Sequence, residues 1–402
     1  MKRNFLAGLV LALACAAAPA LAAEPPLRIA VVNDRTGPFS DYGGEGSVIA
    51  ARLAVEDFGR TVLGRNIEIL SVDHQNKPDV ASTQVRQMFD SGGVDAVADG
   101  AASSAALAIQ SVARERGKIF LITGATTVEL TGKECSPTGF HFAPDTYAIA
   151  NATTKALIAS GGKSWFFITA DYAFGKSLEE QARAVLAANG GKFVGAVRHP
   201  LNSSDMASYL LQAQSSHAEV VGLANAGTDL VNTIKQAQEF GLTGGKQRVT
   251  GFLLDIIDAH ALGLKAAQGL QFVDPFYWDL NDQTRAWAKR FLQASGGKIP
   301  GQIHAGTYTA VLHYLKAVAA AKSTDGPTVA RKMKELPIND MYHANTRIRE
   351  DGRVLNDLHL VTVKSPQESK YPFDYFKLLS VIPGDKSYRP MGEGACPFVA
   401  KR

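Results

Sequence analysis

Two short loops carry the residues that are best suited to hold a small anion. Ser103 and Ser104 follow one apolar run, and Gly124 and Thr126 follow the next apolar run along the chain. Hydroxyl groups and uncrowded backbone N–H groups at the start of a helix are good donors to a carboxylate. Neither loop contains a base that could activate a nucleophile or a set of metal ligands. The pattern therefore predicts a binding site for a small anion rather than a catalytic centre.

Ser103 and Ser104 also have a simpler interpretation. Serine is common at the N-cap of a helix, where its hydroxyl accepts a hydrogen bond from a backbone N–H group. Capping and ligand contact can coexist in one side chain, so both interpretations stay open here.

The elements around these loops alternate between strand and helix. Four apolar runs between positions 27 and 122 are separated by helical patterns, and a second series of the same kind runs from 147 to 273. Such alternation forms parallel sheets covered on both faces, with the loops that follow the strands at one edge of the sheet. Because the segment 131–144 interrupts the alternation, we predict an α/β fold with two doubly wound lobes. The final third adds two long helices, at 282–294 and 304–321, and then two strand-like runs.

The start of the chain is typical of a secretory signal peptide. Lys2 and Arg3 precede a short apolar stretch, and an Ala-x-Ala site ends at Ala22. We expect residues 1–22 to be removed and the mature protein to be exported to the periplasm. Cys15 raises the alternative of a lipoprotein, but the residues before it form a poor lipid-attachment motif.

The charge balance argues against nucleic acid as a partner. Removal of Lys2 and Arg3 lowers the formal net charge from +4 to +2, which leaves no strongly basic field. The mature chain keeps two cysteines, Cys135 and Cys396. An even cysteine count in an oxidising compartment makes a disulfide plausible, and the alternative is two unrelated thiols.

Several motifs of enzymes and metal proteins are absent from the sequence. The nine histidines show no metal-ligand spacing, and there is no nucleophile elbow and no P-loop. We therefore expect no metal, no cofactor and no enzymatic activity.

Five segments together resemble the type I periplasmic solute-binding proteins, in the branched-chain amino acid branch of the ABC-transporter receptors. They occur in the family's order and are IAVVNDRTGPFSDYG, DGAASSAAL, LITGATTVEL, TADYAFGKS and AGTYTAVLHYLKAV. The resemblance implies two lobes that close on a small solute, joined by a hinge of three chain crossings. It implies the following boundaries: 27–141 plus 275–347 for lobe one, 143–273 plus 350–381 for lobe two, and 382–402 for a C-terminal tail.

The resemblance also implies roles for individual residues. Ser103, Ser104, Gly124 and Thr126 correspond to the family's carboxylate contacts, in agreement with the loop chemistry. The resemblance implies that Tyr42 forms an aromatic wall of the pocket and that Tyr172 and Phe174 form an aromatic lid. It implies that Asp255 contacts the ammonium group of an amino-acid ligand. Asp255 could equally be the N-cap of the next helix, and the segment 225–228 lacks an aromatic residue that amino-acid receptors often have.

The predicted function is the substrate-binding component of an ABC importer. We expect a monomer that binds a small carboxylate-bearing solute and delivers it to an inner-membrane permease. The solute is a hydrophobic or branched-chain amino acid, or an aromatic or aliphatic acid. The alternative is a periplasmic sensor or accessory protein of a catabolic system, with an amide or urea as a possible ligand.

Overall fold

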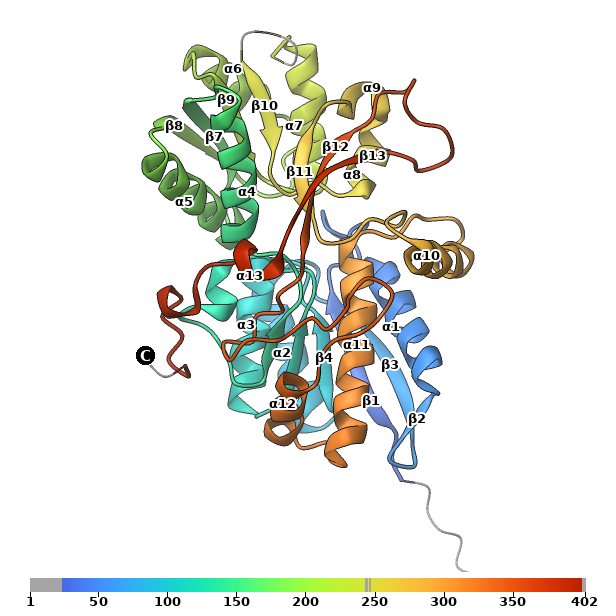
Figure 1. Ribbon diagram of the computed structural model, residues 1–402. Coiled ribbons are helices and arrows are strands. Elements are labelled where there is room, and N and C mark those ends of the chain that lie inside the picture. Colours follow the sequence, from blue (N-terminus) through green and yellow to red (C-terminus); the bar gives the residue numbers. More distant parts are fainter. Residues whose placement is uncertain (1–23, 243–244, 246, 400–402) are drawn as a thin grey trace, which may run out of the picture.

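The computed structural model describes residues 24–242, 245 and 247–399. The predicted signal peptide lies outside the described residues. The described residues form two lobes, one above the other in Figure 1, each with its own sheet. No helix in this described part is both long enough and apolar enough to cross a membrane.

Lobe one, as we use the term, is built on a six-stranded sheet with the order β2-β3-β1-β4-β5-β6. The pairs from β3 to β6 are parallel, as predicted, whereas β2 forms an antiparallel hairpin with β3 that the sequence did not indicate. The elements of lobe one are β1 (Leu27–Asn33), α1 (Gly44–Phe58), β2 (Thr61–Val62), β3 (Arg65–Asp73), α2 (Pro78–Asp90), β4 (Ala96–Asp99), α3 (Ser103–Glu115), β5 (Ile119–Ile122), η1 (Val128–Thr131), β6 (Gly139–His141), α10 (Asp282–Ala294), α11 (Gln302–Ala321) and α12 (Gly326–Glu335).

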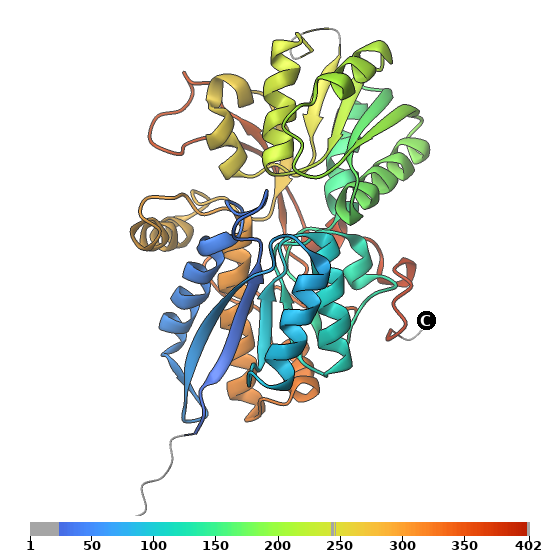
Figure 2. The same cartoon turned by 180° about the vertical axis from the view of Figure 1, so that it is seen from behind.

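Helices cover both faces of this sheet, so its central strands β1, β4 and β5 are buried along almost their whole length. Ile29 and Val31 of β1 pack in one core with α1 and α11. Ala30 and Val32, one residue out of phase, pack in a second core with α2 and α3. Figures 1 and 2 show these two faces, with α11 on the near side in the first view and α2 and α3 on the near side in the second.

Lobe two is built on a parallel four-stranded sheet with the order β10-β9-β7-β8. Strand β7 alternates in the same way, because Trp165 and Phe167 face the core with α4 and α5 while Phe166 and Ile168 face the core with α6 and α7. The elements of lobe two are α4 (Thr146–Ala159), β7 (Ser164–Ala170), α5 (Ala173–Ala188), β8 (Lys192–His199), α6 (Ala207–Ser215), β9 (Val220–Ala224), α7 (Thr228–Glu239), β10 (Arg248–Gly251), α8 (Ile256–Leu262) and α9 (Leu264–Ala267).

A third, antiparallel sheet of three strands runs from the junction of the lobes into lobe two (Figure 1). It consists of β11 (Gln271–Asp274), β12 (Leu358–Val363) and β13 (Phe376–Ile382). We had expected the run at 270–273 to complete the parallel series of lobe two. It does not, because β11 pairs with β12, which lies more than eighty residues further along the chain.

Arg353, a fully buried residue, ties two of the chain crossings together at the hinge. Its guanidinium donates to the carbonyl of Ala143 and to Nδ1 of His141, and it lies 3.7 Å from the carboxylate of Asp145. The ring of Tyr388 covers the guanidinium at 4.8 Å. Since Tyr388 belongs to the C-terminal tail, the tail also packs on the hinge.

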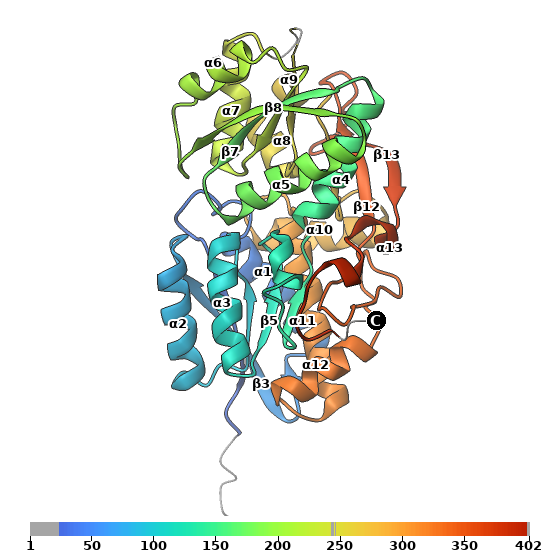
Figure 3. The same cartoon turned by 90° about the vertical axis from the view of Figure 1, so that its left-hand side faces the viewer.

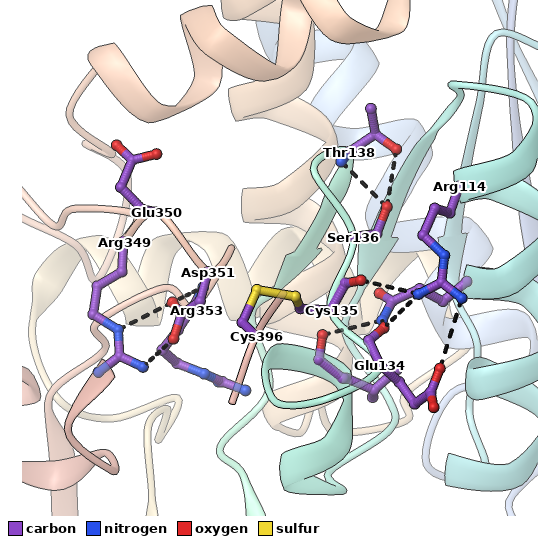
Figure 4. Close-up of a disulfide and its surroundings, with 12 residues drawn as sticks. Arg114, Glu134, Cys135, Ser136, Thr138, Arg349, Glu350, Asp351, Arg353 and Cys396 are labelled. Carbon is purple, nitrogen blue, oxygen red and sulfur yellow. Dashed lines mark hydrogen bonds and ion pairs between the residues drawn. A yellow bond between two sulfur atoms is a disulfide. The ribbon is translucent and has the colours of Figure 1, made fainter. Parts of the chain in front are cut away.

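After β13 the tail passes through α13 (Gly384–Ser387) and the short η2 (Met391–Glu393) and ends on lobe one (Figure 3). There Cys396 forms a disulfide with Cys135, with a Cα–Cα distance of 5.6 Å (Figure 4). The pairing is the one that the cysteine count suggested. Arg114 supports the segment that carries Cys135, because it donates to the carbonyls of Glu134 and Cys135.

The sheets give a physical basis for the domain boundaries. We propose 27–141 plus 275–347 as lobe one and 143–273 plus 350–381 as lobe two. The tail from 382 is bonded covalently to lobe one, because its Cys396 forms a disulfide with Cys135.

Candidate ligand-binding site

A small cavity lies between the lobes, at the carboxyl ends of strands from both sheets. Its volume is about 30 Å³, which corresponds to roughly two water molecules. Lobe one contributes Phe39, Tyr42, Ala101, Ser103, Gly124, Thr126 and Ile303, and lobe two contributes Tyr172, Phe174, Ala226 and Leu253. None of these lining residues is charged.

Ser103 joins the two anion-binding loops of lobe one. Its hydroxyl oxygen accepts hydrogen bonds from the backbone N–H groups of Thr126 (3.4 Å) and Thr127 (3.3 Å). The N-cap of α3 is Ala102, and no side chain caps this helix, so the capping interpretation of Ser103 is wrong. With its oxygen occupied by two donors, the Ser103 hydroxyl keeps its own proton to donate into the cavity.

Gly124 allows the second loop to approach the first. A Cβ atom on Gly124 would lie 2.4 Å from Oδ1 of Asp99 and 2.7 Å from Cα of Ala101, so a side chain does not fit. The hydroxyl of Thr126 makes no hydrogen bond with another described residue and is therefore available to a solute at the cavity wall.

Asp99 organises this edge of lobe one. Its carboxylate accepts hydrogen bonds from the side chain of Asn33 (2.8 Å) and the backbone of Ala101 (3.1 Å). Asp99 and Ala101 both have positive φ angles, of 81° and 30°. L-residues avoid this region, and such strain is often found at functional sites. The result is a sharp turn that directs the first turn of α3 at the cavity.

Ser104 has a different place from the one we expected. It is not among the residues that line the cavity. Its hydroxyl accepts a hydrogen bond of 3.4 Å from the backbone N–H of Ala173, so it joins the start of α3 in lobe one to the start of α5 in lobe two. Ser104 therefore contributes to the contact between the lobes.

The two aromatic residues that we expected to form a lid both line the cavity. Phe174 lies in the first turn of α5, and its ring is buried in the core. Tyr172 lies between Phe174 and Phe39, with ring-centroid distances of 5.8 and 6.1 Å. Since Phe39 belongs to lobe one, the aromatic wall is continuous across the lobes.

Tyr42 also lines the cavity, and its hydroxyl reaches lobe two. It donates to Oδ2 of Asp258 at 2.5 Å and accepts a hydrogen bond of 3.1 Å from the backbone N–H of Gly227. Burial raises the pKa of Tyr42 well above its usual range, and the Asp258 carboxylate adds to this effect.

Asp255 is the N-cap of α8, which was the alternative interpretation of this residue. Its oxygens accept hydrogen bonds from the backbone N–H groups of Ile257 (3.3 Å) and Gln302 (3.0 Å). The side chain is fully buried and does not line the cavity. Its carboxylate is thus occupied by backbone donors rather than presented to an ammonium group.

Sequence reasoning missed five of the residues that line the cavity, namely Phe39, Ala101, Ala226, Leu253 and Ile303. Phe39 could have been found, because it lies in the same glycine-rich loop as Tyr42. The other four are aliphatic residues whose types carry no signal for a binding site.

Two lobes that enclose a cavity at the carboxyl ends of their strands define a bilobed solute-binding protein. A family model described as "Periplasmic binding protein" matches residues 26–370. Since this match covers most of the chain, the protein belongs to the periplasmic binding protein family, in its type I form. Membership of this family implies a periplasmic location.

Individual relatives agree with this assignment. The chain is 27% identical over 254 residues to the "Leu/Ile/Val-binding protein homolog 4" of Brucella abortus. That alignment covers 60% of this chain and 61% of the relative, so the chain spans about three-fifths of the length of the curated relatives it matches.

Two crystal structures match over nearly their whole length. A periplasmic binding protein from Burkholderia mallei is 44% identical, with a TM-score of 0.91 over 93% of this chain and 99% of that chain. A branched chain amino acid ABC transporter periplasmic ligand-binding protein from Burkholderia xenovorans is 36% identical, with a TM-score of 0.82 over 92% and 99% of the two chains.

Proposed function

We propose that this protein is the receptor of an ABC importer for a small carboxylate that has an apolar body and no free ammonium group. A branched aliphatic acid or an aromatic acid fits this description. The importer role is supported by the Burkholderia xenovorans relative, which is described as a branched chain amino acid ABC transporter periplasmic ligand-binding protein.

The observation that carries the proposal is the composition of the cavity wall. Ser103 and Thr126 offer hydroxyl groups, and the first turn of α3 offers backbone N–H groups. These are donors for a carboxylate. In the part of the chain that the structure describes, no carboxylate side chain lines the cavity to accept the hydrogen bonds of an ammonium group. Burying an unpaired ammonium group is costly, so the cavity disfavours a free amino acid.

The rest of the wall is apolar and aromatic, which suits the body of such a solute. Because the cavity as it stands holds only about two waters, a solute enters when the lobes separate. Lobe-two contacts at Tyr172 and Phe174 then form only on closure. A ligand shifts the equilibrium between open and closed forms only through such differential contacts.

A thermal-shift panel of matched pairs tests the proposal. 4-Methylpentanoate is leucine without its ammonium group, and 3-phenylpropanoate is phenylalanine without it. At one hundred times its dissociation constant a ligand adds about 2.7 kcal/mol to the free energy of unfolding. We expect one or both acids to raise the midpoint, with benzoate as a further aromatic acid.

The control compounds are leucine, phenylalanine and 4-methylpentanamide, which lacks the carboxylate. These compounds are expected to leave the midpoint unchanged at the same concentration. Stabilisation by leucine equal to that by 4-methylpentanoate, or no effect from any of the acids, would contradict the proposed ligand class.

A further inference from the structure

Tyr42, Asp258 and Gly227 form a contact that crosses from lobe one to lobe two. The Tyr42 ring lines the cavity, while its hydroxyl binds Asp258 and the backbone of Gly227, both in lobe two. Tyr42 lies on the loop that follows β1, and Asp258 lies in the first turn of α8 (Figure 1). A residue that contacts the solute is therefore oriented by the opposite lobe.

The backbone of lobe two is shaped for this contact. Gly227 has a φ angle of 65°, and a Cβ atom there would lie 2.6 Å from the carbonyl oxygen of Pro38 and 3.3 Å from the Tyr42 ring. Only glycine combines this conformation with so close an approach. The loop that carries Gly227 therefore packs directly against the loop that carries Tyr42.

The carboxylates behind Tyr42 are buried without a cation. Oδ2 of Asp258 also accepts the backbone N–H of Asp255 at 2.8 Å, and the two acids together cap α8. Asp258 is 2% exposed and Asp255 is 0% exposed. Among the described residues, no lysine, arginine or histidine forms an ion pair or a hydrogen bond with either carboxylate. A buried charge without a partner is costly, and such a group binds a proton instead.

We propose that Asp258 is the positioning residue for Tyr42, and that the lobes take up a proton at the Asp255–Asp258 pair when they close. The inference goes beyond the proposed function, because it concerns how the lobes close and does not depend on which solute they hold. Closure removes the pair from water and forms the Tyr42 contact in one event. Opening exposes the pair at the cleft, where both acids ionise.

The charges around the pair act in the same direction. Asp274 on β11 is a third buried acid, and its pKa is raised well above the usual range by burial and by the two other acids. His304 of α11 stays neutral, because burial lowers its pKa to about 4. Three further ionisable groups lie on neighbouring helices. His260 of α8 binds the Tyr375 hydroxyl, and Asp229 of α7 accepts hydrogen bonds from the backbone N–H groups of Asn202 and Ser203. Lys265 is the second residue of α9.

The pH dependence follows from the pKa values of the closed form. Burial raises the pKa of Asp258 to about 8 and that of Asp255 to about 6. An aspartate in water has a pKa of about 3.9. The closed form therefore binds more protons than the open form, so closure is favoured at low pH and weakens as the pH rises from about 4, where the acids of the open form ionise, to about 8. One linked proton changes the ratio of closed to open forms by about tenfold per pH unit.

Small-angle X-ray scattering of the ligand-free mature protein between pH 5 and pH 9 tests the inference. We expect the radius of gyration to increase as the pH rises through this range. Asp258→Asn mimics the protonated acid, so it should stay compact to a higher pH than the parent, with the weaker pH response that Asp255 still gives. Asp79→Asn, on the exposed first turn of α2, is the matched control and should behave like the parent.

Two results would overturn the inference: a radius of gyration in the parent that does not change with pH, or an unchanged pH response in Asp258→Asn. Should Asp258→Asn fail to fold, as judged by circular dichroism, Tyr42→Phe decides the matter. It removes one hydroxyl that holds the closed form together and should therefore open at a lower pH than the parent, and a transition at the same pH as in the parent would contradict the role of Asp258. No solute is used, so a failure of the ligand panel is a separate outcome.

Discussion

At the scale of single residues, the proposed binding of a carboxylate depends on which hydroxyl groups can still donate a hydrogen bond to it. Ser103 accepts two backbone hydrogen bonds and so supports the loop that carries Thr126. Thr126 supplies a hydroxyl that does no such structural work. The two side chains line the same wall of the cavity but differ in what their loss does to the folded protein.

This difference gives a paired prediction. Thr126→Val keeps the shape and removes the hydroxyl, so it should weaken binding of a carboxylate by at least tenfold and leave the unfolding midpoint nearly unchanged. A hydrogen bond to a charged group contributes about 1.5–3 kcal/mol. Ser103→Ala should weaken binding by a similar factor and also lower the free energy of unfolding by about 1–3 kcal/mol, because two buried N–H groups lose their acceptor.

Isothermal titration and chemical denaturation of both variants measure these effects. Equal affinity of Thr126→Val and the parent for the carboxylate would show that the Thr126 hydroxyl does not bind it. A Ser103→Ala variant as stable as the parent would show that Ser103 does not stabilise the loop that carries Thr126.

At the scale of elements, the tail is the part of the chain whose role was least visible in the sequence. It leaves the hinge sheet, packs Tyr388 on the buried Arg353, and is bonded to lobe one through Cys396. The disulfide joins residues that are 261 positions apart. Closure of a long loop in the unfolded chain is the main source of stabilisation by a disulfide.

Cys396→Ser should therefore lower the free energy of unfolding by about 2–5 kcal/mol. Reducing the parent with dithiothreitol should produce the same loss, and adding the reductant to Cys396→Ser should produce no further loss. Equal stability of the oxidised and reduced parent would show that the tail is held by its packing alone.

The sequence predicted the two lobes because apolar runs and helical patterns are local signals. It also indicated Ser103, Gly124 and Thr126, since small polar residues after apolar runs mark the sheet edge. It could not place β11, whose partner β12 lies far along the chain. Nor could it place Ser104 and Asp255, because contacts between lobes follow from how two separately folded units meet. The aliphatic residues of the cavity wall could not be predicted, because residues of these types occur throughout the core.

At the scale of the whole molecule, the lobes meet through polar contacts on both sides of the cavity. Tyr42 with Asp258 and Ser104 with Ala173 each cross from lobe one to lobe two. The closed form is therefore held in part by direct contacts between the lobes. In the proposed mechanism a solute adds contacts with lobe two that only the closed form makes. The hinge strands, together with Arg353 and its bond to the carbonyl of Ala143, join the two lobes.

A substitution that fills the cavity tests most directly whether the solute binds between the lobes. Ala226 lies on the lobe-two side and is almost fully buried, and a larger side chain there would occupy the space between the lobes. Isothermal titration with the acid that stabilises the parent most should give one site per protein chain. In Ala226→Phe, with the fold checked by circular dichroism, the affinity should fall at least a hundredfold. Undiminished binding of the acid by Ala226→Phe would contradict the central claim that the solute is held between the lobes.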